Sequence, residues 1–321
     1  MKTLALLLYT CAAAAIAAGC AGTISASLPL GLGQATEPET AGDRASWMVP
    51  GTTHEDLLYI SNEGSGDVDV YSYPKLTLMG VLSGFYTLRG ECADSAGNVF
   101  ITTGSGSQIV EYAHGGSKPI ATLADPYQTV EGCSVDPTTG NLAAANFSGP
   151  SISQGSISIY KHATGSPEMY FDLLIYYVSF CGYDDKGDLF VDGVSSSREF
   201  VFAELPKGSS LFKSIFLKHP MYTAGNIQWD GKFVAVGDQG NLDHGSAIYQ
   251  DKGASGNVIH TTPLDGSCDV VQFWIQGHTV IGPDSCNNDV ALWKYPRGGS
   301  ATATLTGFST PYGATVSGGR K

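Results

Sequence analysis

Two groups of side chains with the chemistry to bind a ligand recur along this chain at similar intervals. The first group consists of carboxylates and amides in short polar segments, and its members are Asn62, Glu63, Asp192, Asp238 and Asp284. The second group is aromatic, and its members are Tyr86, Tyr127, Tyr177, Tyr222 and Tyr312. Aromatic rings beside carboxylates and amides suit stacking on sugars or holding a peptide. The competing interpretation is structural, because Asp and Asn form turns through local hydrogen bonds and aromatic rings often only pack.

Five cysteines follow residue 20, and one pair of them has the spacing of a disulfide across a hairpin. Cys268 and Cys286 each lie nine residues from Gly277, the centre of a predicted hairpin. Antiparallel pairing about that turn places the two thiols opposite each other, within reach of a bond. Cys133 and Cys181 occupy the same position in successive repeats, which leaves open a second bond near the centre of the fold. No Cys-x-x-Cys or Cys/His spacing indicates zinc.

The elements that position these residues are short strands in a repeat. Segments that combine a turn with an apolar strand begin at intervals of 41, 43, 47, 44 and 46 residues, at Asp56, Gly97, Gly140, Gly187, Gly231 and Gly277. Four short apolar runs per period of about 44 residues are typical of a propeller blade. The alternative, a β-sandwich, does not repeat in this way. The sequence therefore predicts an all-β fold, a six-bladed β-propeller with four-stranded blades.

The two ends of the repeat array predict how the ring closes. The first unit begins at Asp56 with its second strand and has no inner strand before it. The C-terminal run Gly313–Ser317 has the same pattern as Gly132–Asp136, the inner strand of a central unit. We therefore expect residues 313–317 to form the innermost strand of the first blade, which leaves no open sheet edge where the ring closes.

The units resemble those of NHL-type six-bladed propellers, in which an inner strand ends in Asp and a Gly turn precedes an apolar strand. The matching pairs are Asp94 with Gly97, Asp136 with Gly140, Asp184 with Gly187 and Asp230 with Gly231, whereas the last unit has Gln276 before Gly277. The segments GCSVDPTTGNLAAANF and GNIQWDGKFVAVGDQ more closely resemble a group of bacterial surface lipoproteins. This resemblance covers residues 55–317 and implies a fold and a location, but little about activity.

The N-terminal residues resemble a bacterial lipoprotein signal. Lys2 precedes an apolar run that ends in the small residues Ala17-Ala18-Gly19-Cys20. Gly19-Cys20 resembles the lipobox, whose cysteine becomes the lipid-modified N-terminus, although the family usually has Leu in place of Ala17. We expect a signal peptide over residues 1–19, lipidated Cys20 with a flexible tether over 20–54, and the propeller over 55–321. The expected location is the cell envelope, lipid-anchored at the outer membrane or periplasmic face, with ordinary secretion as the alternative.

Charge excludes one class of partner. The formal net charge of −13 disfavours nucleic acid, because phosphate binding depends on Lys and Arg. An acidic surface supports solubility, and we expect a monomer.

Two functions of different classes remain. The first is a binding or scaffolding module for a glycan, peptide or protein ligand, without a cofactor or enzymatic activity. The second, a calcium-dependent lactonase-like hydrolase, is suggested by gluconolactonase-like propellers, which hold calcium at the axis with Glu, Asn and Asp side chains. Such oxygen ligands are available here at Glu91, Glu131, Asn226 and Asp269. The Pro-Asn-Gly and Ser-Asp-Gly segments of that family are missing, and no G-x-S-x-G elbow occurs, so the sequence favours the binding module.

Overall fold

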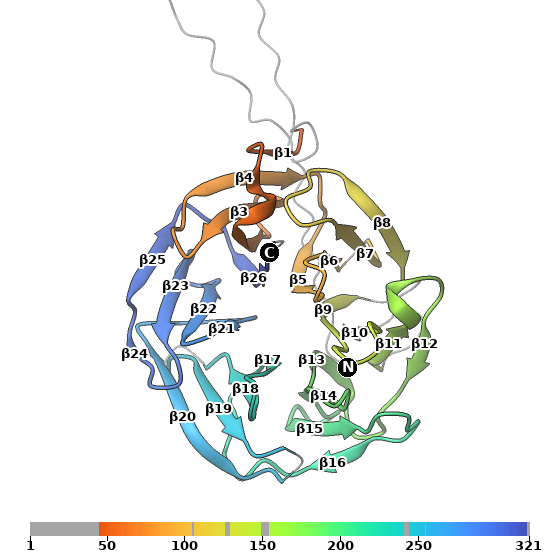
Figure 1. Cartoon of the computed structure of the whole chain (residues 1–321). Helices are drawn as coiled ribbons and strands as arrows, with labels where there is room; N and C mark the ends of the chain where they lie inside the picture. The colour runs from red at the N-terminus through yellow and green to blue at the C-terminus, as the bar shows by residue number, and fades with distance from the viewer. Residues whose placement is uncertain are drawn as a thin grey trace, which may run out of the picture. The chain divides into compact units, whose positions relative to one another are not determined.

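The computed structural model describes residues 45–319, apart from 105, 126–128, 149–153, 241–243 and 254. Six sheets stand around a central axis in chain order, like the blades of a propeller (Figure 1). Neighbouring strands within each blade are antiparallel, apart from one short strand added at the rim of the fifth blade. The predicted six-bladed β-propeller with four-stranded blades is therefore confirmed.

The strands of each blade run as a meander between the axis and the rim. From axis to rim, blade 1 contains β26 (Pro311–Ser317), β2 (Asp56–Asn62), β3 (Asp67–Tyr73), β4 (Leu78–Ser83) and β1 (Trp47–Met48). Blade 2 contains β5 (Leu88–Ala93), β6 (Val99–Thr103), β7 (Gln108–Tyr112) and β8 (Pro119–Ala124). Blade 3 contains β9 (Val130–Val135), β10 (Leu142–Asn146), β11 (Ser156–Tyr160) and β12 (Glu168–Tyr170).

Blades 4 to 6 continue the same order from axis to rim. Blade 4 contains β13 (Tyr177–Tyr183), β14 (Leu189–Val194), β15 (Phe200–Leu205) and β16 (Lys213–Ile215). Blade 5 contains β17 (Ala224–Trp229), β18 (Val234–Asp238), β19 (Ala247–Asp251), β20 (Val258–Asp265) and the added β24 (Gly299–Ser300). Blade 6 contains β21 (Trp274–Gln276), β22 (Thr279–Asp284), β23 (Asp289–Lys294) and β25 (Ala303–Thr306). The helical turns are η1 (Thr52–His54) and η2 (Lys161–Ala163), and no helix among the described residues is long and apolar enough to cross a bilayer.

The second strand of each blade is covered on both faces, which explains its apolar sequence. Every residue of β6, β10 and β18 is buried, as expected for strands sandwiched between two neighbouring sheets. The turn before each of these strands begins with an Asp whose Oδ1 accepts backbone amides, as Asp94 does from Ala96 at 2.9 Å and from Asn98 at 2.8 Å. Gly97 follows with a φ of 89°, a value that favours glycine. The repeated Asp and Gly are therefore turn formers.

The ring closes through the C-terminal strand, as the sequence predicts. β26 pairs antiparallel with β2, with Leu58 opposite Val316 and Ile60 opposite Ala314. His114, from blade 2, reinforces this closure: its Nδ1 lies 2.6 Å from the Ser317 hydroxyl, and its Nε2 donates to the Glu55 carbonyl at 3.0 Å. The two ends of the fold are therefore tied to each other and to the next blade.

Folded structure begins earlier than the expected tether boundary at residue 54. β1 pairs with β4 at the rim of blade 1, with Trp47 opposite Val81 and Met48 opposite Gly80. Gly80 permits this contact, because a Cβ at that position would lie 2.5 Å from the Met48 sulfur. The part of the expected tether that precedes Ala45, together with Cys20 and the signal peptide, lies outside the described residues.

Six hydrophobic clusters occur among the described residues, one at each interface between neighbouring blades. The cluster between blades 2 and 3 includes Phe100 and Tyr160, and the cluster between blades 6 and 1 includes Val290 and Val316. Each fully buried side chain of this size stabilises the fold by about 2 kcal/mol. Because the clusters form a closed circuit, every blade depends on both of its neighbours.

The cysteines show which way the inner-strand side chains point. Cys92 of β5 and Cys133 of β9 form a disulfide, with Cα atoms 5.7 Å apart, and Cys181 is a buried free thiol. The pairing of Cys133 with Cys181 that the sequence left open does not occur. These two residues hold the same position in successive blades, so both point toward the preceding blade and cannot face each other. Cys92 is one residue out of that register and therefore points the opposite way, toward Cys133.

Candidate functional site

The two faces of the ring carry different parts of every blade. The face that we call the connection face holds the loops between second and third strands and the connections from one blade to the next. The opposite face, which we call the turn face, holds the turns between first and second strands and between third and fourth strands. The predicted binding residues that the structure describes lie at or near the connection face.

Two of the predicted carboxylates on the connection face bind backbone rather than solvent. Asp238 accepts hydrogen bonds from the amides of Tyr222, Thr223 and Gly240, each at 3.0 Å. Asp284 holds the same position in blade 6 and accepts the Cys268 amide at 2.7 Å. Both carboxylates are buried and fix the connection that arrives from the preceding blade. This is the structural role that the sequence offered as the competing interpretation.

Asn62 and Asp192 are also engaged inside the protein. The side-chain amide of Asn62 donates to Asp69 at 3.1 Å, and its oxygen accepts the Ser309 amide at 2.9 Å. Asp192 is fully buried and accepts the Phe180 amide at 3.0 Å. Burial raises the pKa of Asp192 well above its usual value, and the hydrogen bond from Phe180 only partly offsets this. Neither side chain is available to a ligand in this arrangement.

Arg89 joins two further predicted residues, Glu63 and Tyr312, at the connection-face end of the axis. Its guanidinium forms ion pairs with Glu63 and with Glu131, whose Oε2 lies 3.2 Å from Nε. The Tyr312 hydroxyl donates to Glu131 Oε2 at 2.5 Å, and the Tyr312 ring centre lies 5.0 Å from Arg89 Cζ. Burial raises the pKa of Glu131, and Arg89 only partly offsets this. The network links blades 1, 2 and 3 through internally paired charges.

Tyr177 is half-buried and packs against two residues that line a small hollow beside this network. Its ring centre lies 4.7 Å from that of Phe147, and Arg198 Cζ lies 4.5 Å from the ring centre of Tyr177. The hollow, of about 250 Å³, is lined by residues that include Phe147, Arg198 and Tyr312. Aromatic and charged groups therefore meet here, with Phe147, Tyr177 and Tyr312 half-buried and Arg198 exposed.

The other predicted tyrosines are exposed or undescribed. Tyr86 and Tyr222 are exposed on connections between blades, and the Tyr222 ring stacks on His244 at a centre distance of 4.6 Å. Tyr127 lies outside the described residues. In the described part of the connection face, the predicted tyrosines therefore lie on different connections and do not gather at one place.

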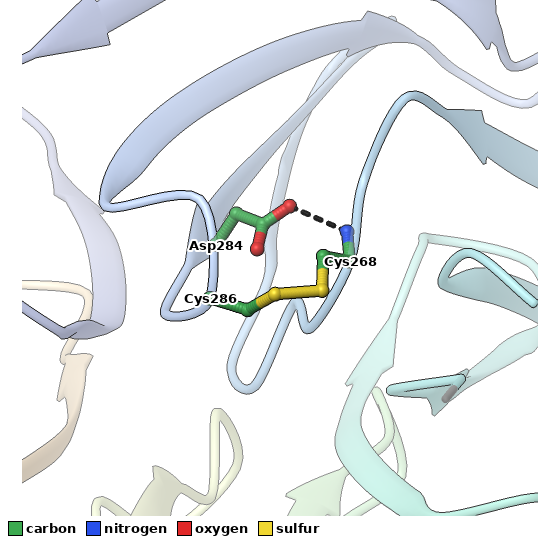
Figure 2. A group of neighbouring side chains, drawn as sticks. All are labelled: Cys268, Asp284 and Cys286. Atoms are coloured by element: carbon green, nitrogen blue, oxygen red, sulfur yellow. Dashed lines mark hydrogen bonds between the residues drawn. A yellow bond between two sulfur atoms is a disulfide. The ribbon is translucent and has the colours of Figure 1, made fainter. Parts of the chain in front are cut away.

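Cys268 and Cys286 form a disulfide at the open end of the β21–β22 hairpin, with Cα atoms 5.8 Å apart (Figure 2). Together with Asp284 they are the only group in the described part of the chain in which three or more His, Cys, Asp or Glu ligand atoms lie within 4.8 Å of one another. Both sulfur atoms belong to the disulfide, so neither is a thiolate that could ligate a metal. The group is a structural link between the hairpin and the loop beside it.

The oxygen ligands considered for calcium are spread over several interfaces. Glu131 belongs to the Arg89 network, and Glu91 is buried close to Tyr59 of blade 1. Asn226 donates its side-chain amide to the Phe273 carbonyl at 2.8 Å. Asp269 accepts the Ser285 hydroxyl at 2.6 Å. Among the described residues the three carboxylates do not converge as a metal-ligand group, so they do not form the oxygen cage that calcium requires.

Three hollows lie on the turn face, whereas one of about 520 Å³ lies on the connection face, where Phe200 and Phe216 line it. A groove of about 690 Å³ separates blades 3 and 4, and its walls include Asn141, Tyr170 and Lys207. An axial pocket of about 290 Å³ is lined by the half-buried Trp229 and Trp274 among others. A third hollow, of about 380 Å³, lies between blades 2 and 3. We call these three hollows together the turn-face surface.

The three hollows lie next to one another around the turn that joins β9 to β10 and share lining residues. Tyr183 lines both the groove and the axial pocket. Val135 and Pro137 line both the axial pocket and the third hollow, and Asp136 lines the third hollow and the groove. The turn-face surface therefore extends from the axis across blades 2, 3 and 4, which suits an extended ligand.

The groove combines charges of both signs with aromatic rings. Lys161 and Lys207 are exposed on its walls, and so is Glu168. Lys207 reaches from blade 4 to blade 3, where its Nζ donates to the Thr138 hydroxyl at 2.6 Å. Tyr170 lies half-buried between these polar groups and presents part of its ring to the groove. Such walls offer hydrogen-bond donors, acceptors and an apolar surface within one hollow.

Asp136, at the centre of the turn-face surface, is held as a carboxylate. Burial raises its pKa, but the Thr139 and Thr138 hydroxyls and the Thr138 amide outweigh burial, so its pKa lies below the usual value. The Thr139 hydroxyl donates to Oδ2 at 2.5 Å, and the Thr138 amide donates to Oδ1 at 2.8 Å. The turn that joins β9 to β10, which lies between the hollows, is therefore rigid and negatively charged at neutral pH.

The sequence predictions missed the aromatic residues of the turn face, although a signal for two of them was present. Tyr183 and Trp229 directly precede the turn residues Asp184 and Asp230, where the preceding units have Ala or Val. An aromatic ring at the end of an inner strand must lie near the axis at the turn face. Trp274 and Tyr170 carry no comparable signal, because their positions depend on how neighbouring blades pack.

Comparisons with known proteins support the architecture. No family model matches this sequence, and no curated protein matches it. Among solved structures, a chain in the crystal structure of a nidogen/laminin complex superimposes with a TM-score of 0.68 at 14% identity, covering 83% of this chain and 100% of that one. A protein of unknown function from Bacteroides caccae superimposes with a TM-score of 0.62 at 12% identity, covering 82% and 99% respectively. At these identities the likeness is one of fold, and the chain is a six-bladed β-propeller.

Proposed function

We propose that this protein is a cell-envelope lipoprotein of the NHL-type propeller group whose propeller binds a glycan on the turn face. The observation that carries the proposal is the turn-face surface, in which three adjacent hollows combine aromatic rings with carboxylates, amides and lysines. The protein acts as a binding module that catalyses no reaction. It is anchored to the outer membrane or periplasmic face through lipid on Cys20.

A glycan fits this surface better than a peptide or a folded partner. Sugar rings have an apolar face that stacks on aromatic side chains, and their hydroxyls need many donors and acceptors. Trp229 and Trp274 supply aromatic surface at the axis, and Tyr170 supplies it in the groove. The hollows are concave and follow the blades, whereas a folded protein partner needs a broader and flatter area.

A glycan array tests the proposal on the mature chain in which Cys20→Ser removes the lipid. We expect binding to a defined subset of glycans, and we expect Tyr170→Ala to weaken that binding at least tenfold through loss of one stacking ring. Met169→Ala is the matched control, because its side chain lies next along β12 and points to the opposite face of the sheet. Absence of binding to every glycan, or equal losses in both variants, would reject the turn-face site.

The lipid anchor is tested separately from the binding site. Expression with radiolabelled palmitate should label the wild-type chain and should leave Cys20→Ser unlabelled. An unlabelled wild-type chain that appears in the culture medium would replace the anchor with ordinary secretion and would leave the glycan site untouched.

A further inference from the structure

Large apolar side chains are exposed on the blade-to-blade connections of the connection face. Leu173 is 92% exposed, Phe216 is 84% exposed and Tyr86 is 71% exposed. Phe171, Leu174 and Tyr222, on two of the same connections, are also exposed. We call Tyr86, Phe171, Leu173, Leu174, Phe216 and Tyr222 the apolar rim. These residues share one face because every blade-to-blade connection of the ring lies there.

Exposed charges of both signs lie on the connection face beside this apolar surface, among them Glu199, Asp265 and Lys218. Three further carboxylates of this face, Asp192, Asp238 and Asp284, are buried. The exposed Lys218 lies within the same connection as Phe216, and its Nζ donates to an amide oxygen, that of Asn257, at 2.7 Å. Part of the negative charge of the connection face is therefore buried, and Lys218 places a positive charge beside Phe216, which favours contact with an anionic lipid surface.

The polypeptide enters the propeller at this same face. The Ser83 amide, at the connection-face end of β4, donates to the Ser46 hydroxyl at 2.9 Å. β1 then runs from that end toward the turn face, with Trp47 opposite Val81. Tyr86 follows three residues after Ser83. Residues 21–44 can span at most about 80 Å when fully extended, so a lipid on Cys20 keeps this face within reach of the membrane.

We propose that the apolar rim docks on the lipid bilayer that holds the anchor, with the turn-face surface directed away from it. Exposed Leu, Phe and Tyr side chains beside a lysine are the composition that enters the headgroup region of a bilayer. The orientation relies on the lipid anchor of the proposed function. The lipid on Cys20 and the apolar rim together attach the propeller to the bilayer at two places. The hollows of the turn face then open toward ligands on the side away from the bilayer.

Vesicle binding without the covalent lipid tests the rim alone. The mature Cys20→Ser chain is sedimented with vesicles of phosphatidylethanolamine and phosphatidylglycerol. We expect the chain to partition onto the vesicles, and we expect the double variant Leu173→Ser/Phe216→Ser to partition at least tenfold less, because each buried apolar side chain contributes roughly that factor. Leu211→Ser is the matched control, since Leu211 is 74% exposed but lies on a turn of the opposite face.

Each outcome of this experiment either supports or rejects docking of the apolar rim on the bilayer. Loss of partitioning in the double variant, with Leu211→Ser unchanged, supports docking. Failure of the parent chain to partition, equal losses in both variants, or a rim-dependent dimer in sedimentation without vesicles would overturn it. Palmitate labelling and glycan binding by the same chains report separately on the proposed function, so a failed rim leaves those results intact.

Discussion

Acidic side chains at the inner ends of the blades meet very different partners. Asp238 and Asp284 bind backbone amides, and Glu131 is paired with Arg89. Glu91 is fully buried, and no lysine, arginine or histidine among the described residues forms an ion pair with it. Burial raises the pKa of Glu91 well above its usual value, and Ser61 offsets this only in part.

Glu91 is therefore expected to make the stability of the protein depend on pH. A carboxyl whose pKa is raised by folding stabilises the native state fully below its unfolded pKa, and this contribution is lost as the pH rises through the folded pKa. Glu91→Gln removes the ionisable group while keeping its shape. Denaturant unfolding between pH 4 and 8 should show that the variant gains stability over wild type once the pH exceeds the unfolded pKa, by about 1.4 kcal/mol per pH unit until the pH reaches the folded pKa.

The control for this experiment is Glu168→Gln, which changes an exposed carboxylate at the rim of blade 3. Its free energy of unfolding should follow that of the wild type over the same pH range. A Glu91→Gln variant that also runs parallel to the wild type would contradict a neutral, buried Glu91.

The register and pairing of individual strands determine two features of the fold. The first feature is the disulfide pattern. Alternation of side chains along β5, β9 and β13 places Cys92 opposite Cys133 and leaves Cys181 buried alone. Peptide mapping of the unreduced chain should find Cys92 linked to Cys133 and Cys268 linked to Cys286. Cys181 should react with an alkylating reagent only after unfolding. A peptide that links Cys133 to Cys181 would show that the inner strands lie in another register.

The second feature is closure of the ring by β26. Deletion of residues 311–321 removes Ala314 and Val316 from the cluster between blades 6 and 1, together with the Ser317 contact to His114. We expect the midpoint of thermal unfolding to fall by at least about 10 °C, because several kcal/mol of burial are lost and each costs about 2–4 °C in a chain of this size. Deletion of residues 320–321 alone is the control and should leave the midpoint unchanged. Equal melting of both truncations would refute closure by β26.

At the scale of the whole molecule, the fold was predictable because six units carry the same information. The Asp and Gly turn residues and the apolar second strands recur with one period, so each unit supports the assignment of the others. The similarity in sequence pattern between Gly132–Asp136 and Gly313–Ser317 was enough to predict β26 as the closing strand.

The candidate site was less predictable, for a physical reason. An Asp that ends a strand looks the same in sequence whether it binds a ligand or, as Asp238 does, the backbone amides of its own connection. The hollows arise between blades, where the space left by packing depends on residues far apart in the chain. Only the aromatic residues before Asp184 and Asp230 marked the turn face in advance.

The two faces of the propeller carry different features. The connection face holds the chain entry and the apolar rim, and the turn face holds the three adjacent hollows. The central claim is that the ligand binds to the turn face, where the half-buried aromatic rings of Tyr170, Trp229 and Trp274 lie.

Hydroxyl-radical footprinting with a bound glycan tests that claim most directly, using a glycan selected on the array. We predict that the glycan protects Tyr170, Trp229 and Trp274 from oxidation and leaves the exposed Tyr86 and Tyr222 as reactive as in the free protein. Protection of Tyr86 and Tyr222, with the three turn-face rings unchanged, would contradict it.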